Sequence, residues 1–292
     1  MPKYSLMNRT VLVTGAAGGI GAASAQALHA RGANLVLVGR NASSVAALAH
    51  ELGHERALSL SSDVTEPGAM DEVVARAVDR FGGLDVVFAN AGIAPGRPAT
   101  IAAMDPTEFA QIIEVNLLGA WRTVRAALPE VIANQGHVLV NSSVYAYING
   151  AMNAPYAASK AAVEQMTRAL RVELGAHGAT AGILYPGWVA TEMTRLVFGG
   201  DDLVTRMREL AFPCILAGSI SPDVVARRVV KGIEHRTAAI TIPRRWQPVG
   251  LLRGLVNPLS DRLLIRNAKF QSLLQVLDEQ ARLGRVAADP RG

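Results

Sequence analysis

Tyr156 and Lys160 have the spacing that most directly suggests chemistry. They lie four positions apart in the segment Tyr-Ala-Ala-Ser-Lys, so on a helix their side chains share one face. A free tyrosine loses its proton near pH ~10, and a neighbouring ammonium favours the phenolate, which lowers the tyrosine pKa toward neutrality. The pair could therefore act as an acid or a base on a substrate oxygen. A Tyr-x-x-x-Lys pair alone is weak evidence, because amphipathic helices also produce it by chance.

Ser143 and Asn116 are the two polar residues that strengthen this hypothesis. Ser143 ends the segment Asn-Ser-Ser, thirteen positions before Tyr156, and its hydroxyl could donate a hydrogen bond where negative charge develops on the substrate oxygen. Asn116 lies in the segment Glu-Val-Asn-Leu-Leu-Gly. Taken singly, the serine is equally well explained as a cap at a strand end, and the asparagine as a buried amide in a helix.

A glycine-rich turn joins the first predicted strand to the first predicted helix. Residues 14–21 read Thr-Gly-Ala-Ala-Gly-Gly-Ile-Gly. Glycines at such a turn let the backbone approach a pyrophosphate, which the free N–H groups at the helix N-terminus can then bind. The spacing T-G-x-x-x-G-x-G differs from the commoner G-x-G-x-x-G, and a glycine turn with no ligand is the alternative.

This turn and the four polar residues together resemble the short-chain dehydrogenase/reductase family, over roughly residues 8–243. The resemblance implies a catalytic tetrad of Asn116, Ser143, Tyr156 and Lys160, and hydride transfer between a nicotinamide dinucleotide and a carbonyl or alcohol. It implies that Tyr156 donates the proton to the alkoxide and that Ser143 hydrogen-bonds the same oxygen. Lys160 would hold the ribose hydroxyls, and Asn116 would support Lys160 through an ordered water.

The expected dinucleotide site extends along the carboxyl ends of the strands. By the resemblance, Asp63 contacts the adenine, residues 90–92 line the adenosine, and residues 186–191 pack beside the nicotinamide. Without the resemblance, Asp63 would be a helix cap and the other two segments would be turns. The expected cofactor-binding residues are Gly15, Gly19, Ile20, Gly21, Arg40, Asp63, Val64, Asn90, Ala91, Gly92, Tyr156, Lys160, Pro186, Gly187, Val189 and Thr191. No metal site is expected, since the six histidines and the single cysteine lack metal-ligand spacing.

Arg40 indicates which dinucleotide is bound. The second strand ends Val-Leu-Val-Gly-Arg, so Gly39 stands where a carboxylate would accept hydrogen bonds from the ribose 2′-hydroxyl of NAD. A guanidinium directly after it could pair with a 2′-phosphate, which favours NADP(H). NAD(H) is the alternative, in which Arg40 is only a solvated charge at a strand end. Gly18 leaves the turn without the second basic residue that would strengthen the case for NADP(H).

Strands and helices alternate along the chain and position these residues. Short apolar runs without period-two alternation are typical of buried strands, and helices separate them. This order predicts a doubly wound (Rossmann) α/β fold, in which about seven parallel strands are covered on both faces. The strands are predicted at 10–15, 34–38, 57–60, 84–89, 137–141, 180–185 and 238–242. The helices are predicted at 20–31, 43–52, 70–81, 107–133 (one helix or two), 155–177 and 222–235.

Residues 192–218, the lid, are predicted to cover the substrate. Their many apolar side chains and few polar anchors favour a lipophilic carbonyl or alcohol. A lid that merely packs on its own core would need the same residues. The apolar lid residues are Met193, Leu196, Val197, Phe198, Leu203, Met207, Leu210, Phe212 and Ile215.

Residues 244–292, the extension, form a basic amphipathic segment after the catalytic domain of residues 1–243. The extension has nine basic and four acidic residues, so it carries the whole net charge of +5. A helix is predicted at 261–283, and its apolar stripe is expected to dock on the lid or on a partner subunit. Trp246 and the leucines among basic residues also suit peripheral membrane contact, which is less favoured. Nucleic-acid binding is not expected, because no recognition motif accompanies the charge.

The sequence as a whole predicts an NADP(H)-dependent oxidoreductase that interconverts a ketone or aldehyde and an alcohol. The alternatives are an NAD-dependent alcohol dehydrogenase of the same family and a non-catalytic dinucleotide sensor, which the complete tetrad disfavours. A composition that is 50% hydrophobic excludes a disordered protein. A single cysteine and the lack of a signal peptide predict a cytoplasmic protein or one at a membrane surface. By the resemblance, a homodimer or homotetramer is expected through the helices at 107–133 and 155–177.

Overall fold

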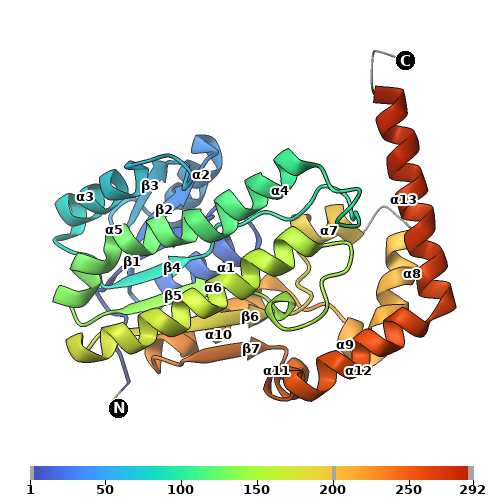
Figure 1. The fold of residues 1–292 in the computed structure, drawn as a ribbon. Helices are drawn as coiled ribbons and strands as arrows, with labels where there is room; N and C mark the ends of the chain where they lie inside the picture. The colour runs from blue at the N-terminus through green and yellow to red at the C-terminus, as the bar shows by residue number, and fades with distance from the viewer. Residues whose placement is uncertain (1–2, 199–201, 289–292) are drawn as a thin grey trace.

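A seven-stranded sheet forms the centre of the molecule, for which a computed structural model describes residues 3–198 and 202–288 (Figure 1). All neighbouring strands are parallel, in the order β3-β2-β1-β4-β5-β6-β7. The predicted doubly wound parallel sheet is therefore confirmed. The strands are β1 (Thr10–Thr14), β2 (Asn34–Gly39), β3 (Ala57–Ser61), β4 (Val86–Ala89), β5 (His137–Asn141), β6 (Thr180–Pro186) and β7 (Ala239–Ile242).

Helices cover both faces of this sheet, which explains why the strands are apolar without alternation. In β1, Val11 and Val13 pack on one face, whereas Leu12 packs on the other. The first face is covered by α1 (Gly19–His29), α2 (Ala42–Leu52) and α10 (Pro222–Glu234). The second face is covered by α3 (Ala69–Phe81), α5 (Ala120–Ala133) and α6 (Ala154–Glu173), after which η3 (Leu174–His177) completes the predicted helix 155–177 as a 3₁₀ turn.

The predicted helix at 107–133 is three consecutive segments. It begins with α4 (Pro106–Ile113), whose first turn is capped by Asp105, and it continues through a π-helical turn, η1 (Glu114–Gly119), into α5. The apolar periodicity gave no sign of the π turn. Such turns insert one extra residue into a helix and are frequent at functional sites. This one contains Asn116.

The described residues of the lid form three short helices, which are α7 (Glu192–Phe198), α8 (Asp202–Ala211) and α9 (Cys214–Ala217). The side chains of Leu196, Val197 and Leu203, among the apolar lid residues named above, lie outside the part that the structure describes, as does that of Phe198. Among the rest, Met207 is fully buried and Ile215 is exposed.

The extension folds back on the lid. It consists of η4 (Arg244–Trp246), α11 (Gln247–Leu251), α12 (Arg253–Arg266) and α13 (Ala268–Ala288). The predicted single helix at 261–283 is wrong, because Asn267 leaves the helical conformation and its Oδ1 accepts a hydrogen bond from Phe270 N at 3.1 Å. This cap starts α13, which runs beside α8 (Figure 1). Phe270 and Leu277 are buried there against Met207 of α8.

No helix within the described ranges, 3–198 and 202–288, combines the length and the hydropathy that crossing a membrane requires.

Candidate active site

The carboxyl ends of the central strands meet the start of α6 at a cavity of about 50 Å³, the catalytic pocket. Ser143 follows β5 after one residue, and Tyr156 lies in the first turn of α6. Both side chains line this pocket. Its lining residues are Ala94, Ser143, Val144, Tyr145, Asn153, Tyr156, Gly187, Trp188, Met193 and Thr194.

The pKa of Tyr156 is raised, so the expected lowering of this pKa by Lys160 is wrong. Burial is the main cause, and a hydrogen bond with Ser143 opposes it. Lys160 Nζ lies 5.4 Å from the centre of the tyrosine ring. Its ammonium instead donates to the carbonyl oxygen of Asn141 at 2.9 Å. The phenol is therefore held in its protonated form at neutral pH.

Lys160 is itself deeply buried, and this burial lowers its pKa to about 8. A buried ammonium is costly, so burial shifts the equilibrium toward the neutral amine, although the ammonium still predominates at pH 7. The bond to Asn141 O at the end of β5 holds the amine beside the tyrosine. The sequence placed Lys160 one helical turn after Tyr156, and the structure brings both to the strand end that precedes Ser143.

Asn116 is a buried amide that ties two elements of the site together. Its Oδ1 accepts from Ile93 N at 2.8 Å, and its Nδ2 donates to Ile93 O at 2.9 Å and to Ser159 Oγ at 3.0 Å. Ser159 Oγ in turn donates to Tyr156 O at 2.7 Å. An ideal Cβ at Gly92 would lie 3.2 Å from Asn116 Oδ1 and 3.4 Å from Lys160 Nζ. All four predicted tetrad residues are thus gathered in one place.

The glycine turn has a shape that fits a dinucleotide. Gly15 and Gly19 have φ of +63° and +45°, a left-handed conformation that side chains disfavour. At Gly21, an ideal Cβ would lie 2.0 Å from Gly15 O, so only glycine allows this close approach of helix and turn. A Cβ at Gly18 would meet nothing within 4 Å. The turn is therefore tightly folded at Gly15, Gly19 and Gly21, and it has open space beside Gly18.

The N-terminus of α1 has neither a side-chain cap nor an acidic residue in its first turn. Ile20 is its second residue. Such an end presents N–H groups and partial positive charge to an anion. The turn also reaches the predicted nicotinamide segment, because a Cβ at Gly19 would lie 2.8 Å from Thr191 Cγ2. The glycine turn, the N-terminus of α1 and Thr191 therefore fit the phosphates and the nicotinamide end of a dinucleotide.

Asn90 links the strand ends on the adenosine side. Its Nδ2 donates to Thr14 O at 3.0 Å and to Gly15 O at 3.2 Å, and its Oδ1 accepts from Asn141 Nδ2 at 2.9 Å. The N–H groups of Asn90 and Ala91 both donate to Thr14 Oγ1, at 3.0 and 3.1 Å. Asn90 therefore fixes the glycine turn against β4 and β5.

Asp63 does not cap a helix. Its Oδ1 accepts from Thr65 N at 2.9 Å and Thr65 Oγ1 at 2.8 Å, which closes a turn, and α3 begins only at Ala69. Val64 is buried, and its Cγ2 lies 2.5 Å from where a Cβ of Gly119 would be. Both residues follow β3 at the carboxyl edge of the sheet, where the dinucleotide is expected.

Arg40 follows β2 with an exposed side chain. A Cβ at Gly39 would lie 3.0 Å from Val45 Cγ1, so a carboxylate-bearing residue there would be crowded. The N-terminus of α2 begins just after Arg40, capped by Asn41, whose Oδ1 accepts from Ser44 N at 3.0 Å. A guanidinium beside a helix N-terminus suits an anion.

The predicted nicotinamide segment also holds the extension in place. An ideal Cβ at Gly187 would lie 2.6 Å from Trp246 Nε1, so glycine is required where the extension's tryptophan packs. Pro186 O faces Ser143 Oγ at 3.5 Å. Val189 is buried and pairs with Ile220 in an isolated bridge.

Sequence reasoning missed a series of aromatic rings that starts at the catalytic tyrosine. Tyr145 lies edge-on to both Tyr156 and Trp188, with ring centres 5.7 Å apart in each pair. Phe212 of the lid continues the series, 5.6 Å from Trp188 and 5.9 Å from Trp246. These edge-to-face contacts join residues far apart in the chain, so no local spacing could have predicted them.

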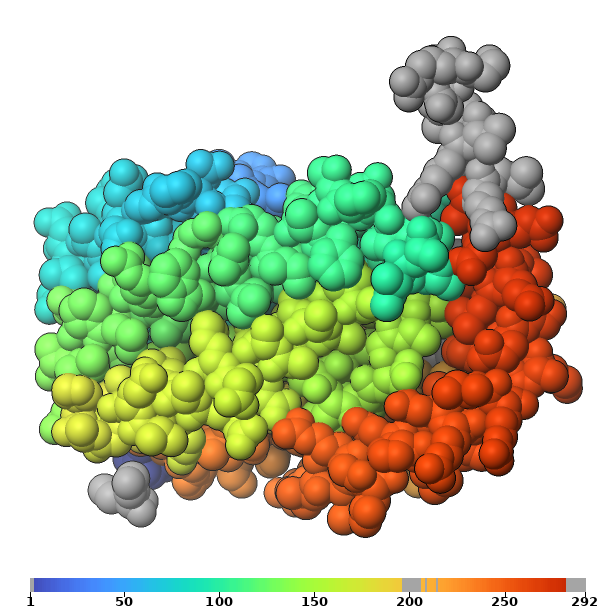
Figure 2. All heavy atoms as spheres, viewed as in Figure 1, coloured from blue at the N-terminus to red at the C-terminus, as the bar shows by residue number. Residues whose placement is uncertain are grey.

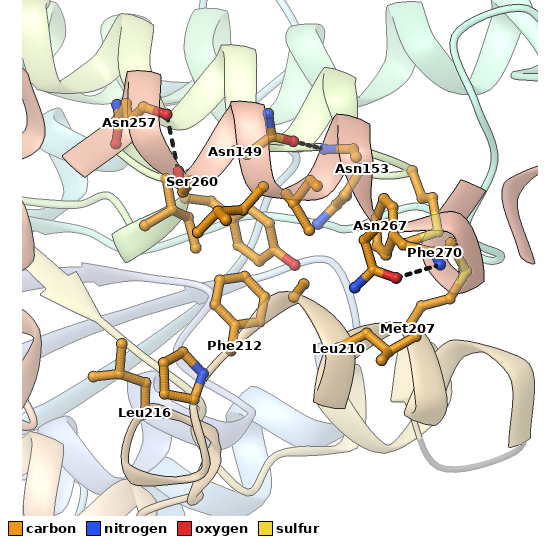
Figure 3. A pocket seen from close by; sticks show the side chains of 18 of the residues that line it. Asn149, Asn153, Met207, Leu210, Phe212, Leu216, Asn257, Ser260, Asn267 and Phe270 are labelled. Carbon is orange, nitrogen blue, oxygen red and sulfur yellow. Dashed lines mark hydrogen bonds between the residues drawn. The ribbon is translucent and has the colours of Figure 1, made fainter. Parts of the chain in front are cut away.

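A second cavity of about 630 Å³, the chamber, lies between the lid and the extension (Figure 3). Met207, Leu210 and Phe212 face it from the lid, and α12 lies across its other side. Tyr145 and Asn153 line both the chamber and the catalytic pocket, so the two are adjacent. Asn153 Oδ1 is buried there and has no hydrogen-bond partner among the described residues.

Comparison with known proteins agrees with this site. A family model for short chain dehydrogenases matches residues 9–200, which leaves the extension outside it. An uncharacterized oxidoreductase of Staphylococcus aureus strain MRSA252 is 35% identical over 190 residues, 65% of this chain and 81% of the relative. An alcohol dehydrogenase from the archaeon Thermococcus sibiricus, solved with 5-hydroxy-NADP, is 28% identical, with a TM-score of 0.69 over 80% of this chain and 95% of its own.

A short chain dehydrogenase/reductase from Burkholderia phymatum, solved with NAD, shares the fold at 20% identity, with a TM-score of 0.75 over 86% of this chain and 94% of its own. The family model covers most of the sheet, the glycine turn and all four tetrad positions. The chain is an oxidoreductase that belongs to the short-chain dehydrogenase family.

Proposed function

We propose that the protein reduces a lipophilic ketone or aldehyde to an alcohol with NADPH. The observation that carries this proposal is the position of Ser143 and Tyr156 in a small pocket that adjoins a large apolar chamber. When bound, the dinucleotide supplies the hydride. Gly15, Gly19 and Gly21 would admit its pyrophosphate, and Lys160 would hold its ribose hydroxyls.

The protein's own residues manage the proton and the developing charge. A carbonyl oxygen in the catalytic pocket would accept hydrogen bonds from Tyr156 Oη and Ser143 Oγ. As negative charge develops on this oxygen, Tyr156 donates its proton and Ser143 stabilises the remaining charge. Asn116 acts through Ser159 and the backbone of Tyr156, so it is a positioning residue.

The state of Tyr156 suits the reduction of a carbonyl. Burial raises its pKa, so the phenol holds the proton that reduction requires.

The preference for NADP(H) rests on Arg40. Its exposed guanidinium and the start of α2 both suit the 2′-phosphate, and Val45 crowds the place of a carboxylate. Related structures were solved with an NADP derivative and with NAD. The Arg40→Ala variant should therefore lose at least about tenfold in affinity for NADPH and keep its affinity for NADH. Fluorescence titration with both nucleotides tests this, and an unchanged preference would favour the NAD-dependent alternative.

The lipophilic substrate is supported by the chamber. Volumes of about 300–1,000 Å³ are usual for pockets that bind small molecules. Asn153 is a polar residue where the chamber adjoins the catalytic pocket. Other residues that line the chamber, such as Tyr145, Met152 and Phe212, have apolar or aromatic side chains. A carbonyl at one end of a long apolar chain could reach Tyr156 while the chain fills the chamber.

The test is NADPH oxidation with aldehydes and ketones of increasing chain length. We expect kcat/KM to rise with length until the chamber is full. In an Ala211→Trp variant, whose larger side chain would fill part of the chamber, activity on long substrates should fall while short ones are unaffected. A profile independent of length would count against the lipophilic substrate, and no turnover with NADPH still bound would favour the sensor alternative.

A further inference from the structure

α12 exposes an apolar surface that borders the chamber. Its exposed residues are Gly254, Leu255, Pro258, Leu259, Arg262, Leu263, Ile265 and Arg266. Every one of them is glycine, proline, aliphatic or arginine. The helix has one acidic residue, Asp261, which is partly buried and accepts a hydrogen bond from Asn149 Nδ2 at 2.9 Å. The exposed surface of α12 therefore combines apolar and positive groups without an exposed acid.

Leucines recur at every fourth position along α11 and α12. Leu251 and Leu255 are each 76% exposed, and Leu259 and Leu263 are 60% and 63% exposed. Residues four apart lie on one side of a helix, so Leu255, Leu259 and Leu263 form a stripe along α12, here called the outer stripe, and Leu251 precedes it at the end of α11. Val256 and Leu264 are less exposed and line the chamber, which Leu259 and Leu263 also border. The outer stripe is nevertheless more than half exposed, and a contiguous exposed apolar surface usually marks a contact with a partner.

Charge decides between the possible partners. Arg262 and Arg266 lie beside the outer stripe, one turn apart, and both are exposed. In a twofold-symmetric dimer through this surface, both copies would bring the same two arginines to one interface, and α12 has no exposed acid to pair with them. A bilayer with anionic headgroups has the complementary charge, and its acyl region can receive the leucines.

We propose that the outer stripe, with Arg262 and Arg266, binds the surface of an anionic lipid bilayer. α12 then lies in the plane of the membrane, with its leucines below the headgroups and its arginines among them. Figures 1 and 2 show that α11 and α12 lie at the edge of the molecule, with the sheet and its helices to one side.

The chamber opens toward this surface. Leu259 and Leu263 are more than half exposed, and both also line the chamber. A lipid-soluble molecule could therefore pass between them from the bilayer into the chamber. This passage rests on the proposed function, whereas binding of the surface to lipid does not.

The test is flotation of the full-length protein with vesicles of phosphatidylcholine alone or mixed with phosphatidylglycerol. We expect binding to the anionic vesicles to be at least about tenfold stronger. Leu255→Glu should abolish it, because the variant places a negative charge in the stripe. Val172→Glu is the matched control, since Val172 is 81% exposed and lies near the end of α6, outside the extension and the chamber lining. Arg262→Gln with Arg266→Gln should lose roughly tenfold on anionic vesicles alone.

Thermal melts of each variant would establish that it is folded. The proposal is overturned if the wild type does not bind anionic vesicles, or if Leu255→Glu and Val172→Glu bind equally. It is also overturned if the arginine variant binds as well as the wild type. A dimer that Leu255→Glu dissociates in analytical ultracentrifugation, without vesicle binding, would identify a second copy as the partner. Because turnover is not measured, failure of the proposed function would leave these results unchanged.

Discussion

At the scale of the residue, burial shifts the pKa values of Tyr156 and Lys160 in opposite directions. The phenol's pKa is raised and the amine's is lowered to about 8, because burial penalises both charged forms. At neutral pH the phenol therefore keeps its proton, whereas Lys160 is still mainly an ammonium that loses its proton more easily than an exposed lysine does. The hydrogen bonds of Lys160 and Asn116 hold the groups in place despite this cost.

Replacing the catalytic tyrosine separates chemistry from binding. In Tyr156→Phe the ring and its contact with Tyr145 remain, but the proton donor is lost. We expect kcat for carbonyl reduction to fall by roughly 10²–10⁴-fold, the usual contribution of a general acid. NADPH affinity, measured by fluorescence titration, should stay within about threefold of the wild type. Full activity in the variant would remove Tyr156 from the mechanism.

The lowered pKa of Lys160 predicts how stability depends on pH. Between pH 10.5, the ordinary value, and about 8, the unfolded chain binds a proton that the folded protein does not. The free energy of unfolding should therefore rise with pH across this window, by on the order of 3 kcal/mol from this group. Urea unfolding without nucleotide, at pH 8 and pH 10, measures the rise.

Lys160→Met is the comparison for this pH dependence. It keeps a long side chain in the buried site but has no titrating group, so the contribution should disappear and stability at neutral pH should not fall. If the variant showed the same rise as the wild type, some other group would be responsible for it.

At the scale of the element, the site depends on places where the backbone approaches another segment closely. Gly21 brings α1 against the glycine turn, Gly119 brings the π turn against Val64, and Gly187 admits Trp246. The π turn between α4 and α5 places Asn116 toward Ile93 and Ser159. These contacts set the relative positions of strand ends and helix starts to within a few tenths of an ångström, because core packing leaves little room for adjustment.

Two glycines of the same turn should respond differently to alanine. In Gly21→Ala the new Cβ would lie 2.0 Å from Gly15 O, so the turn must shift. We expect NADPH affinity to fall at least about tenfold and unfolding to become easier by about 1–3 kcal/mol. Gly18→Ala is the control, since its Cβ meets nothing and its φ of −143° is ordinary. Its stability should change by less than about 0.5 kcal/mol. Calorimetric titration and thermal melts would distinguish the two, and equal effects would contradict the close-approach argument.

At the scale of the whole molecule, the extension completes the substrate side of the enzyme. Trp246 is buried against Gly187 and Phe212, α12 walls the chamber, and α13 packs on α8. Arg253 of α12 forms an ion pair with Glu164 of α6 at 2.9 Å. The boundary predicted at residue 243 therefore marks a change in composition, but the two parts share one packed interior.

Removing the Trp246 side chain should weaken this connection. Trp246 is 1% exposed, so Trp246→Ala should lower the free energy of unfolding by about 3–5 kcal/mol. The lid would lose its contact through Phe212, and KM for long substrates should rise more than KM for short ones. Ile101→Ala, at an exposed position, should cost less than about 0.5 kcal/mol. A melt of Trp246→Ala that matches the wild type would show that the extension is not part of the cooperative fold.

The sequence by itself determined the sheet, the order of its elements and the family. Each of these rests on local information, such as apolar runs of strand length, glycines at a turn, and Tyr156 one helical turn before Lys160. Such signals can be interpreted without knowing which distant residues are in contact. The same reasoning could not detect the π turn around Asn116 or the break at Asn267, because both interrupt a helix whose apolar pattern continues.

Only the tertiary structure decided the chamber, the aromatic series from Tyr156 to Trp246, and the pKa shifts at the catalytic centre. These features depend on which side chains of the lid, the extension and the strand ends are in contact. They also depend on how far those contacts exclude water from the site. Burial reversed the expected shift of the Tyr156 pKa, because desolvation outweighed the opposing hydrogen bond with Ser143. The Lys160 ammonium is directed toward Asn141 O. Spacing along a chain fixes which groups are neighbours on one element, but energies at a site follow from all the elements that enclose it.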